Sequence, residues 1–227
     1  MGEMVEFPSN GHTARGYVAR SVEGAGPGVV VIQEWWGLVP HIQDVCERFA
    51  AEGFTALAPD LYQGKSTTEP DEAGKLMMSM NLDEASKDMG GAIDFLKASD
   101  AVRGAGVGVV GFCMGGGLAL KLAVDRAADV NAVVPFYGLI PWEGAVPDWR
   151  RLDCAVLGHY ASQDAFFTPE AAQELERTLR ELGKDVEFHQ YDADHAFFND
   201  ERPEVHDPED AARAWERTID FLRSHLG

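Results

Sequence analysis

The alternation of strand-like and helix-like segments constrains the fold of this chain more than any other feature of its sequence. A continuous apolar, β-branched run such as 28–33 (GVVVIQ) is typical of a strand buried on both faces. Segment 41–52 then carries apolar residues at helical spacing and is followed by Gly53, a stop signal. Because this pattern repeats to the end of the chain, it predicts a mostly parallel central sheet with helices on both faces.

The same patterns place the individual elements. Strands are predicted at 5–7, 14–20, 28–33, 55–62, 107–112, 131–138, 154–160 and 185–191. Helices are predicted at 41–52, 71–98 with a break near Asn81, 114–126, 169–182 and 208–226. The turn residues 9–12 (SNGH) join the first two strands in a hairpin, and Thr168 caps the helix that ends at Gly183. No repeat or linker interrupts the chain, so we expect a single domain over residues 1–227.

Composition narrows the class of protein. Of the 227 residues 45% are hydrophobic, which is enough for one sizeable core. No apolar run approaches the ~18 residues that span a bilayer, and the first residues lack the pattern of a secretory signal. The three cysteines, Cys46, Cys113 and Cys154, cannot all pair, and their spacing fits no metal motif. We therefore expect a cytoplasmic protein with free thiols.

The net charge of −19 restricts the partners of the protein. It argues against nucleic acid and against an anionic membrane surface. We attribute most of this charge to solubility. An anionic small substrate would be repelled at long range and would need local positive charge to bind.

The stretch VVGFCMGGG (109–117) places Cys113 where a predicted strand ends and a predicted helix begins. Such a sharp bend strains the residue at the turn, and its neighbours must be small. Gly111 and Gly115 complete the G-x-S-x-G nucleophile pattern, with cysteine in place of serine. The helix N-terminus would favour a thiolate and a developing oxyanion. The alternative interpretation is a buried structural cysteine.

A histidine and an acid follow later in the chain, each just after a predicted strand. Asp164 lies in SQDAFF and His195 in DADHAFFN. Because sites in such folds lie beyond the carboxyl ends of the strands, both are expected at the same edge of the sheet as the cysteine. The order nucleophile, acid, histidine is that of the α/β-hydrolase fold. Asp192 and Asp194 compete for the role of the acid; with His195 they could mark a metal site, which we do not favour because further suitably spaced ligands are lacking.

These residue types predict a definite chemistry. An ordinary thiol is only partly ionised at neutral pH, so His195 would take the proton of Cys113. Asp164 would fix the imidazole tautomer and stabilise the imidazolium. The backbone N–H groups of Met114 and Trp35 are the candidate donors to an oxyanion.

Glu34 directly follows an apolar strand, where a buried charge without a partner would be costly. Two interpretations stay open. The side chain is exposed to solvent, or it is held near the active centre as a partner for the thiol or for His195.

The motifs VIQEWWG, APDLY, VGFCMGG, FYG, GHYASQDAFFTP and DADHAFFN follow one another over nearly the whole chain. Together they resemble the dienelactone hydrolases (carboxymethylenebutenolidases), small single-domain enzymes with the α/β-hydrolase fold. The resemblance implies a triad of Cys113, Asp164 and His195 that opens an enol-lactone through a thioester, without metal or cofactor. It also implies that Glu34 is the family's strand-end glutamate, which contacts the cysteine and helps to switch it from thiol to thiolate when substrate arrives.

The sequence departs from the family where the substrate carboxylate is gripped by two arginines. Segment 62–100 contains no arginine, and Asn199 stands at the second position, four residues after the histidine. Arg202 is close enough in sequence to substitute. A missing bidentate clamp weakens recognition of a carboxylate. The candidate substrate contacts are Trp36, Tyr62, Tyr137, Phe166, Phe197, Asn199 and Arg202.

The sequence thus favours a cysteine-dependent hydrolase of enol-lactones or small carboxylic esters, acting as a monomer or small homo-oligomer on a small molecule. A non-catalytic α/β-hydrolase relative that binds a small ligand is the main alternative. A redox sensor that uses Cys113 is a third, although no C-x-x-C or resolving cysteine supports it.

Overall fold

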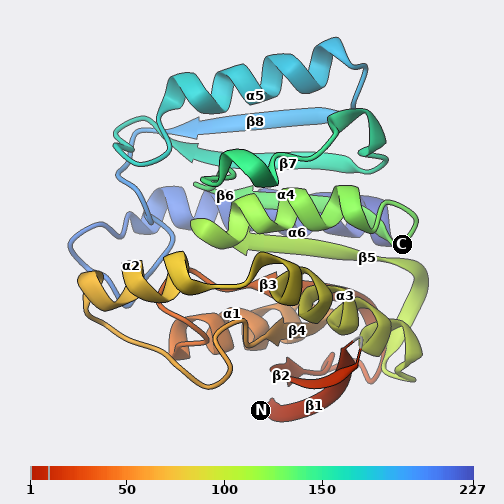
Figure 1. The fold of residues 1–227 in the computed structure, drawn as a ribbon. Coiled ribbons are helices and arrows are strands. Elements are labelled where there is room, and N and C mark those ends of the chain that lie inside the picture. The colour runs from red at the N-terminus through yellow and green to blue at the C-terminus, as the bar shows by residue number, and fades with distance from the viewer. Residues whose placement is uncertain (1, 10) are drawn as a thin grey trace.

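One mixed sheet forms the centre of the molecule (Figure 1). The computed structural model describes residues 2–9 and 11–227. In this part of the chain the sheet has eight strands, in the order β1 (Glu3–Ser9), β2 (His12–Ala19), β4 (Thr55–Pro59), β3 (Gly26–Ile32), β5 (Val102–Phe112), β6 (Val130–Phe136), β7 (Ala155–Ala161) and β8 (Val186–Tyr191). The pairs β1–β2 and β2–β4 are antiparallel and all other pairs are parallel, which confirms the predicted mostly parallel sheet.

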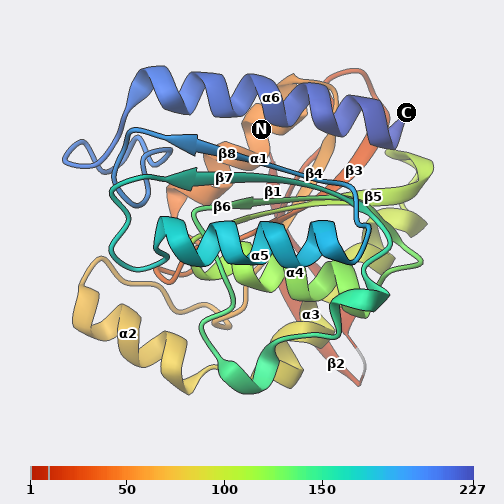
Figure 2. The same cartoon turned by 90° about the horizontal axis from the view of Figure 1, so that it is seen from above.

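Helices cover both faces of this sheet, as predicted. On one side lie α1 (Pro40–Ala51) and α6 (Pro208–Leu226), and on the other α3 (Leu82–Ala98), α4 (Met114–Asp125) and α5 (Pro169–Glu181) (Figure 2). The alternating side chains of β3 show why: Val30 and Ile32 pack into one hydrophobic cluster, whereas Val29 and Val31 pack into the other. Because β3 buries apolar side chains on both faces, each face needs helices to exclude water.

A further helix, α2 (Pro70–Ser79), lies apart from these two layers, near the carboxyl ends of the parallel strands (Figures 1 and 2). It buries only Ala73 among its own residues. The predicted break near Asn81 is confirmed, because the Asn81 side chain caps α3 by accepting hydrogen bonds from the N–H groups of Asp83 and Glu84. The helical pattern predicted over 71–98 therefore corresponds to two helices, of which α2 is mostly exposed and α3 buries one face.

Other predicted caps and turns agree with the structure. Thr168 caps α5 by accepting a hydrogen bond from the N–H of Ala171, and Gly183 follows that helix with a φ of +72°. The hairpin of β1 and β2 is confirmed by pairing that extends to Ser9 and His12. Asn10, within the predicted turn, lies outside the described residues.

Two strands differ from their predicted bounds by more than two residues at one end. β5 begins at Val102 rather than at 107, because its first half contains glycines, one of them Gly104 with a φ of +98°, and lacks a continuous apolar run. β4 ends at Pro59 rather than at 62 because Asp60 turns the chain, its carboxylate accepting hydrogen bonds from the N–H groups of Tyr62 and Gly64. The short 3₁₀ helices η1 (Glu143–Ala145) and η2 (Trp149–Arg151) had no signal in the sequence.

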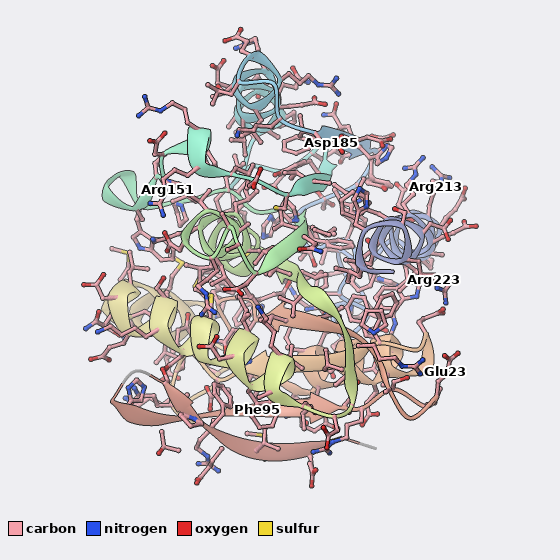
Figure 3. The ribbon with its side chains drawn as sticks, turned by 90° about the vertical axis from the view of Figure 1, so that its right-hand side faces the viewer. Glu23, Phe95, Arg151, Asp185, Arg213 and Arg223 are labelled. Atoms are coloured by element: carbon pink, nitrogen blue, oxygen red, sulfur yellow. The ribbon has the colours of Figure 1, made fainter. Side chains whose placement is uncertain are left out.

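Charged side chains extend from the outer helices at the surface, and Arg223 of α6 is one of them (Figure 3). Arg223 of α6 donates hydrogen bonds to the backbone oxygen and to the carboxylate of Glu52, which follows α1. On the opposite face Phe95 of α3 packs on Phe7 of β1, with ring centres 5.8 Å apart.

Among the helices described, none has the length and hydropathy needed to cross a membrane.

Glycines let α4 approach the sheet more closely than any other residue would permit. A Cβ on Gly115 would lie 2.4 Å from the backbone oxygen of Gln33 and 2.5 Å from that of Ile32. A Cβ on Gly111 would lie 2.0 Å from the backbone oxygen of Gly115. These positions need glycine because the obstructing atoms are backbone, which cannot move aside as a side chain can.

We expect Gly115→Ala to lower the free energy of unfolding by about 2 kcal/mol or more, since the new methyl group would meet fixed backbone. Urea denaturation would measure this change. Gly74→Ala in α2 is the matched control, because a Cβ there meets nothing within 4 Å, and it should leave the stability unchanged or slightly raised. Equal unfolding midpoints for the two variants would contradict the close packing of α4.

Candidate active site

Cys113 stands at the sharp turn between β5 and α4. Its backbone has a φ of 54° and a ψ of −121°, a conformation that residues other than glycine rarely adopt. Hydrogen bonds hold the turn: the N–H of Cys113 donates to the backbone oxygen of Phe136, and the N–H of Gly116 donates to the oxygen of Cys113. All three cysteines are free thiols, and Cys113 is partly exposed whereas Cys46 and Cys154 are buried. The alternative of a buried structural cysteine at 113 therefore does not hold.

His195 and Asp164 form a hydrogen-bonded pair. The Nδ1 atom of His195 lies 2.7 Å from Oδ2 of Asp164. The other carboxylate oxygen, Oδ1, accepts hydrogen bonds from the N–H groups of Phe166 and Phe167 at 2.8 and 2.9 Å. Both oxygens of the buried carboxylate therefore have partners, which fixes its orientation toward the imidazole.

Cys113 lines the same cavity as His195 and affects the pKa of its imidazole. Burial by itself lowers the pKa of His195, but hydrogen bonds and charge interactions with Asp164 and Cys113 outweigh it and raise the pKa to about 10. The raised pKa of His195 therefore has its cause in a carboxylate and a sulfur next to the ring. The structure brings together the three residues that the sequence analysis selected.

The competing acids lie elsewhere. Asp192 accepts hydrogen bonds from the side chains of Ser162 and Gln163, and Asp194 is exposed. The partner of His195 is Asp164.

Glu34 is buried at the end of β3, with 1% of its surface exposed. Its Oε1 accepts a hydrogen bond from the hydroxyl of Tyr137 at 3.3 Å, and its Oε2 accepts one from Nδ2 of Asn199 at 2.8 Å. Burial and then the charge of Glu34 raise the pKa of Tyr137 well above its usual value, so this hydroxyl stays a neutral donor. Of the two interpretations of Glu34, exposure to solvent is wrong. The carboxylate is held in the wall of the site by two neutral partners.

Tyr137 connects Glu34 with His195. Its side chain is fully buried, and the centre of its ring lies 5.1 Å from that of His195. Its φ of 36° is another unusual backbone angle, and Ala196, next to His195, has a φ of 66°. Strained backbone is thus found at Cys113, at Tyr137 and at Ala196, the residue after His195.

A cavity of about 380 Å³ opens onto Cys113 and His195. Most of its lining is apolar and comes from Trp35, Trp36, Pro70, Met77, Met114, Pro141, Phe166, Phe167 and Ala196. Its ionisable lining groups are those of Glu34, Cys113, His195 and Arg202. A cavity of this size and composition suits a small, largely apolar ligand.

The candidate substrate contacts divide into two sets. Trp36, Phe166 and Arg202 line the cavity. Tyr62, Tyr137, Phe197 and Asn199 are buried and are not among its lining residues. The aromatic or polar character of these residues does not predict which of them line the cavity and which are buried in the core, because this depends on how the loops pack.

Other lining residues had no signal in the sequence. Pro70 and Met77 belong to α2, and Pro141 and Phe167 lie in loops that follow β6 and β7. A methionine at helical spacing is indistinguishable in sequence from a core residue, and the placement of α2 over the site is a tertiary feature.

The two candidate oxyanion donors lie at suitable backbone positions. Met114 is the first residue of α4, where an N–H group has no acceptor within its own helix. Trp35 lies inside the turn that is closed by the hydrogen bond from the N–H of Gly37 to the backbone oxygen of Glu34. Both residues line the cavity beside Cys113.

Comparisons with known proteins agree with this architecture. The model of the "Dienelactone hydrolase family" matches residues 14–226. The chain is 40% identical to "Protein usf" of Aquifex pyrophilus and 36% identical to a putative carboxymethylenebutenolidase of Aquifex aeolicus, in each case over the full length of both chains. The crystal structure of a putative dienelactone hydrolase from Klebsiella pneumoniae superimposes with a TM-score of 0.88 and 27% identity, covering 99% of both chains.

We expect Asp164→Asn to lower the pKa of His195, because it removes a negative charge yet keeps an oxygen that can accept from the N–H groups of Phe166 and Phe167. Titration of the imidazole followed by NMR would measure the shift. In Asp192→Asn, the control, the pKa of His195 should stay where it is in the wild type. An unchanged pKa in Asp164→Asn would contradict the role of this carboxylate.

The same pair links stability to pH. The pKa of His195 is raised in the folded protein above its ordinary value of about 6.5. Its contribution to the free energy of unfolding is therefore complete below about pH 6.5 and is lost as the pH rises toward about 10. The difference in unfolding free energy between the wild type and Asp164→Asn should shrink over this interval.

Proposed function

The chain belongs to the dienelactone hydrolase family, and from this membership we propose that it hydrolyses enol-lactones or small carboxylic esters with Cys113 as nucleophile. The observation that carries the proposal is the placement of His195, which pairs with Asp164 at 2.7 Å and lines the same apolar cavity as Cys113. A nucleophile in contact with a base that is oriented by a buried acid is the arrangement required for acyl transfer.

The first step would form a thioester. With its high pKa, His195 holds the proton taken from Cys113, and the sulfur attacks the carbonyl carbon of the substrate. The carbonyl oxygen becomes an oxyanion, which the N–H groups of Met114 and Trp35 would stabilise. When this intermediate collapses, the carbon–oxygen bond of the ester breaks and the leaving oxygen takes the proton from His195.

The second step would release the acid. His195, now neutral, takes a proton from a water molecule, and the resulting hydroxide attacks the thioester carbon. The carbon–sulfur bond breaks, and the proton on His195 again faces the thiolate of Cys113. Asp164 stabilises the imidazolium in both steps because its Oδ2 faces Nδ1 of the ring.

We assign Glu34 to the control of the thiol rather than to the bond-breaking steps. Both of its carboxylate oxygens are engaged by Tyr137 and Asn199, so it has no proton to transfer in this arrangement. Its negative charge lies in the same cavity wall as Cys113, where it opposes the formation of a second negative charge.

The wild type should release a rapid burst of 4-nitrophenol from 4-nitrophenyl butyrate, followed by slower steady turnover, because acylation precedes hydrolysis of the thioester. Cys113→Ala should lose both phases, with a decrease of about a thousandfold or more in kcat. Stopped-flow absorbance would measure the burst. Cys154→Ala, which removes a thiol outside the site, should retain both.

Equal turnover in Cys113→Ala and the wild type would contradict the proposed nucleophile. Failure of the wild type to hydrolyse any activated ester would favour the non-catalytic ligand-binding alternative.

Glu34→Gln should make Cys113 react faster with iodoacetamide at neutral pH, because it removes a negative charge that opposes the thiolate. The alkylation rate, followed by mass spectrometry of the peptide containing Cys113, would measure this effect. Glu209→Gln removes an equal charge at an exposed residue that does not line the cavity and serves as the control. A slower reaction in Glu34→Gln would show that the carboxylate promotes the thiolate instead.

A further inference from the structure

Arg202 is the single lysine or arginine among the described residues that line the catalytic cavity. A guanidinium in such a position could bind a substrate carboxylate through two parallel hydrogen bonds. The charge and shape of the substrate therefore depend on whether this group is available to it.

The guanidinium of Arg202 is already engaged. Its Nε and Nη2 atoms each lie 2.9 Å from Oε1 of Glu204. Its carbon Cζ lies 5.6 Å from the centre of the Trp36 ring, within the range of a cation–π contact. Glu204 does not line the catalytic cavity. It lines an adjoining cavity of about 380 Å³, and the two cavities share Trp36, Pro70 and Arg202.

The remaining charge at the site is unfavourable to an anion. Glu34 is buried in the cavity wall, and its partners Tyr137 and Asn199 are neutral, so no ion pair offsets its charge. Glu201 joins Glu204 in the lining of the adjoining cavity. Because Glu34 is buried, its charge is screened less than a charge on the open surface.

We propose that Glu204 is a specificity-determining residue, which holds the charge of Arg202 away from the substrate and so restricts the site to uncharged, apolar esters and lactones. This inference rests on the proposed function. It deepens that function by naming the substrate class: a neutral acyl group in contact with Trp36, Met77 and Phe166.

A pair of substrates that differ by one charge would test this. Wild-type protein would be assayed with 4-nitrophenyl butyrate and with the 4-nitrophenyl monoester of succinic acid, which carries a carboxylate in place of the terminal methyl group. We expect kcat/KM to be about tenfold or more higher for the butyrate. The difference should decrease with added salt, because it is electrostatic.

Glu204→Gln should narrow this preference by about fivefold, which is the scale of one exposed ion pair. The change should lie in KM for the succinate ester, with kinetics for the butyrate unchanged, because the freed guanidinium binds the carboxylate and takes no part in bond breaking. The double variant Glu204→Gln/Arg202→Gln should lose the gain, which would show that it acts through Arg202.

Glu209→Gln is the matched charge control. Glu209 pairs with Arg213 on α6, at an exposed position outside the cavity lining, and Figure 3 shows Arg213 at the outer surface. If Glu204→Gln shifts the preference no more than Glu209→Gln does, or if the wild type prefers the succinate ester with turnover that depends on Cys113, this inference alone is overturned. Full turnover in Cys113→Ala, or turnover of neither ester, would overturn the proposed function and the inference with it.

Discussion

The bend at Cys113 is the constraint on which the rest of the site depends. The chain passes from β5 into α4 at one residue, with a φ of 54°, and this requires α4 to lie directly against the backbone of β3. Glycine at 111 and 115 makes that approach possible. The strained bend then raises the sulfur above the end of the sheet and places the N–H of Met114 beside it, so packing and chemistry depend on the same contact.

The charges of the site are arranged around this bend in a definite order. Asp164 lies behind His195 and raises its pKa, in opposition to burial, together with the sulfur of Cys113. Glu34 lies on the other side, held by neutral donors. In the proposed mechanism, one carboxylate stabilises the positive imidazolium, while the second limits the negative charge that the sulfur develops. Two acids of similar intrinsic acidity act differently because their partners differ.

The lining of the cavity comes partly from the ends of the sheet strands and partly from a helix and loops outside the sheet. Cys113 and Glu34 are at the ends of parallel strands, whereas Pro70 and Met77 belong to α2, a helix that buries little of its own surface. Arg202 closes a third side, paired with Glu204 and stacked on Trp36. The proposed reacting groups are thus fixed by the sheet, and the rest of the cavity lining comes from segments that can differ without altering the sheet.

The sequence by itself determined the parallel sheet, its helical layers and the selection of Cys113, Asp164 and His195. Hydrophobic periodicity reports burial, and the glycine spacing at 111 and 115 reports a bend that only small residues permit. Only the tertiary structure decided which polar groups meet. In the structure, Glu34 accepts hydrogen bonds from Tyr137 and Asn199, and Arg202 forms an ion pair with Glu204. Residues of α2 line the cavity, whereas Phe197 does not. The contacts of Glu34 join segments far apart in the chain, whereas Arg202 and Glu204 are only two residues apart. All of them depend on how the loops pack, and loop packing produces no periodic pattern in the sequence.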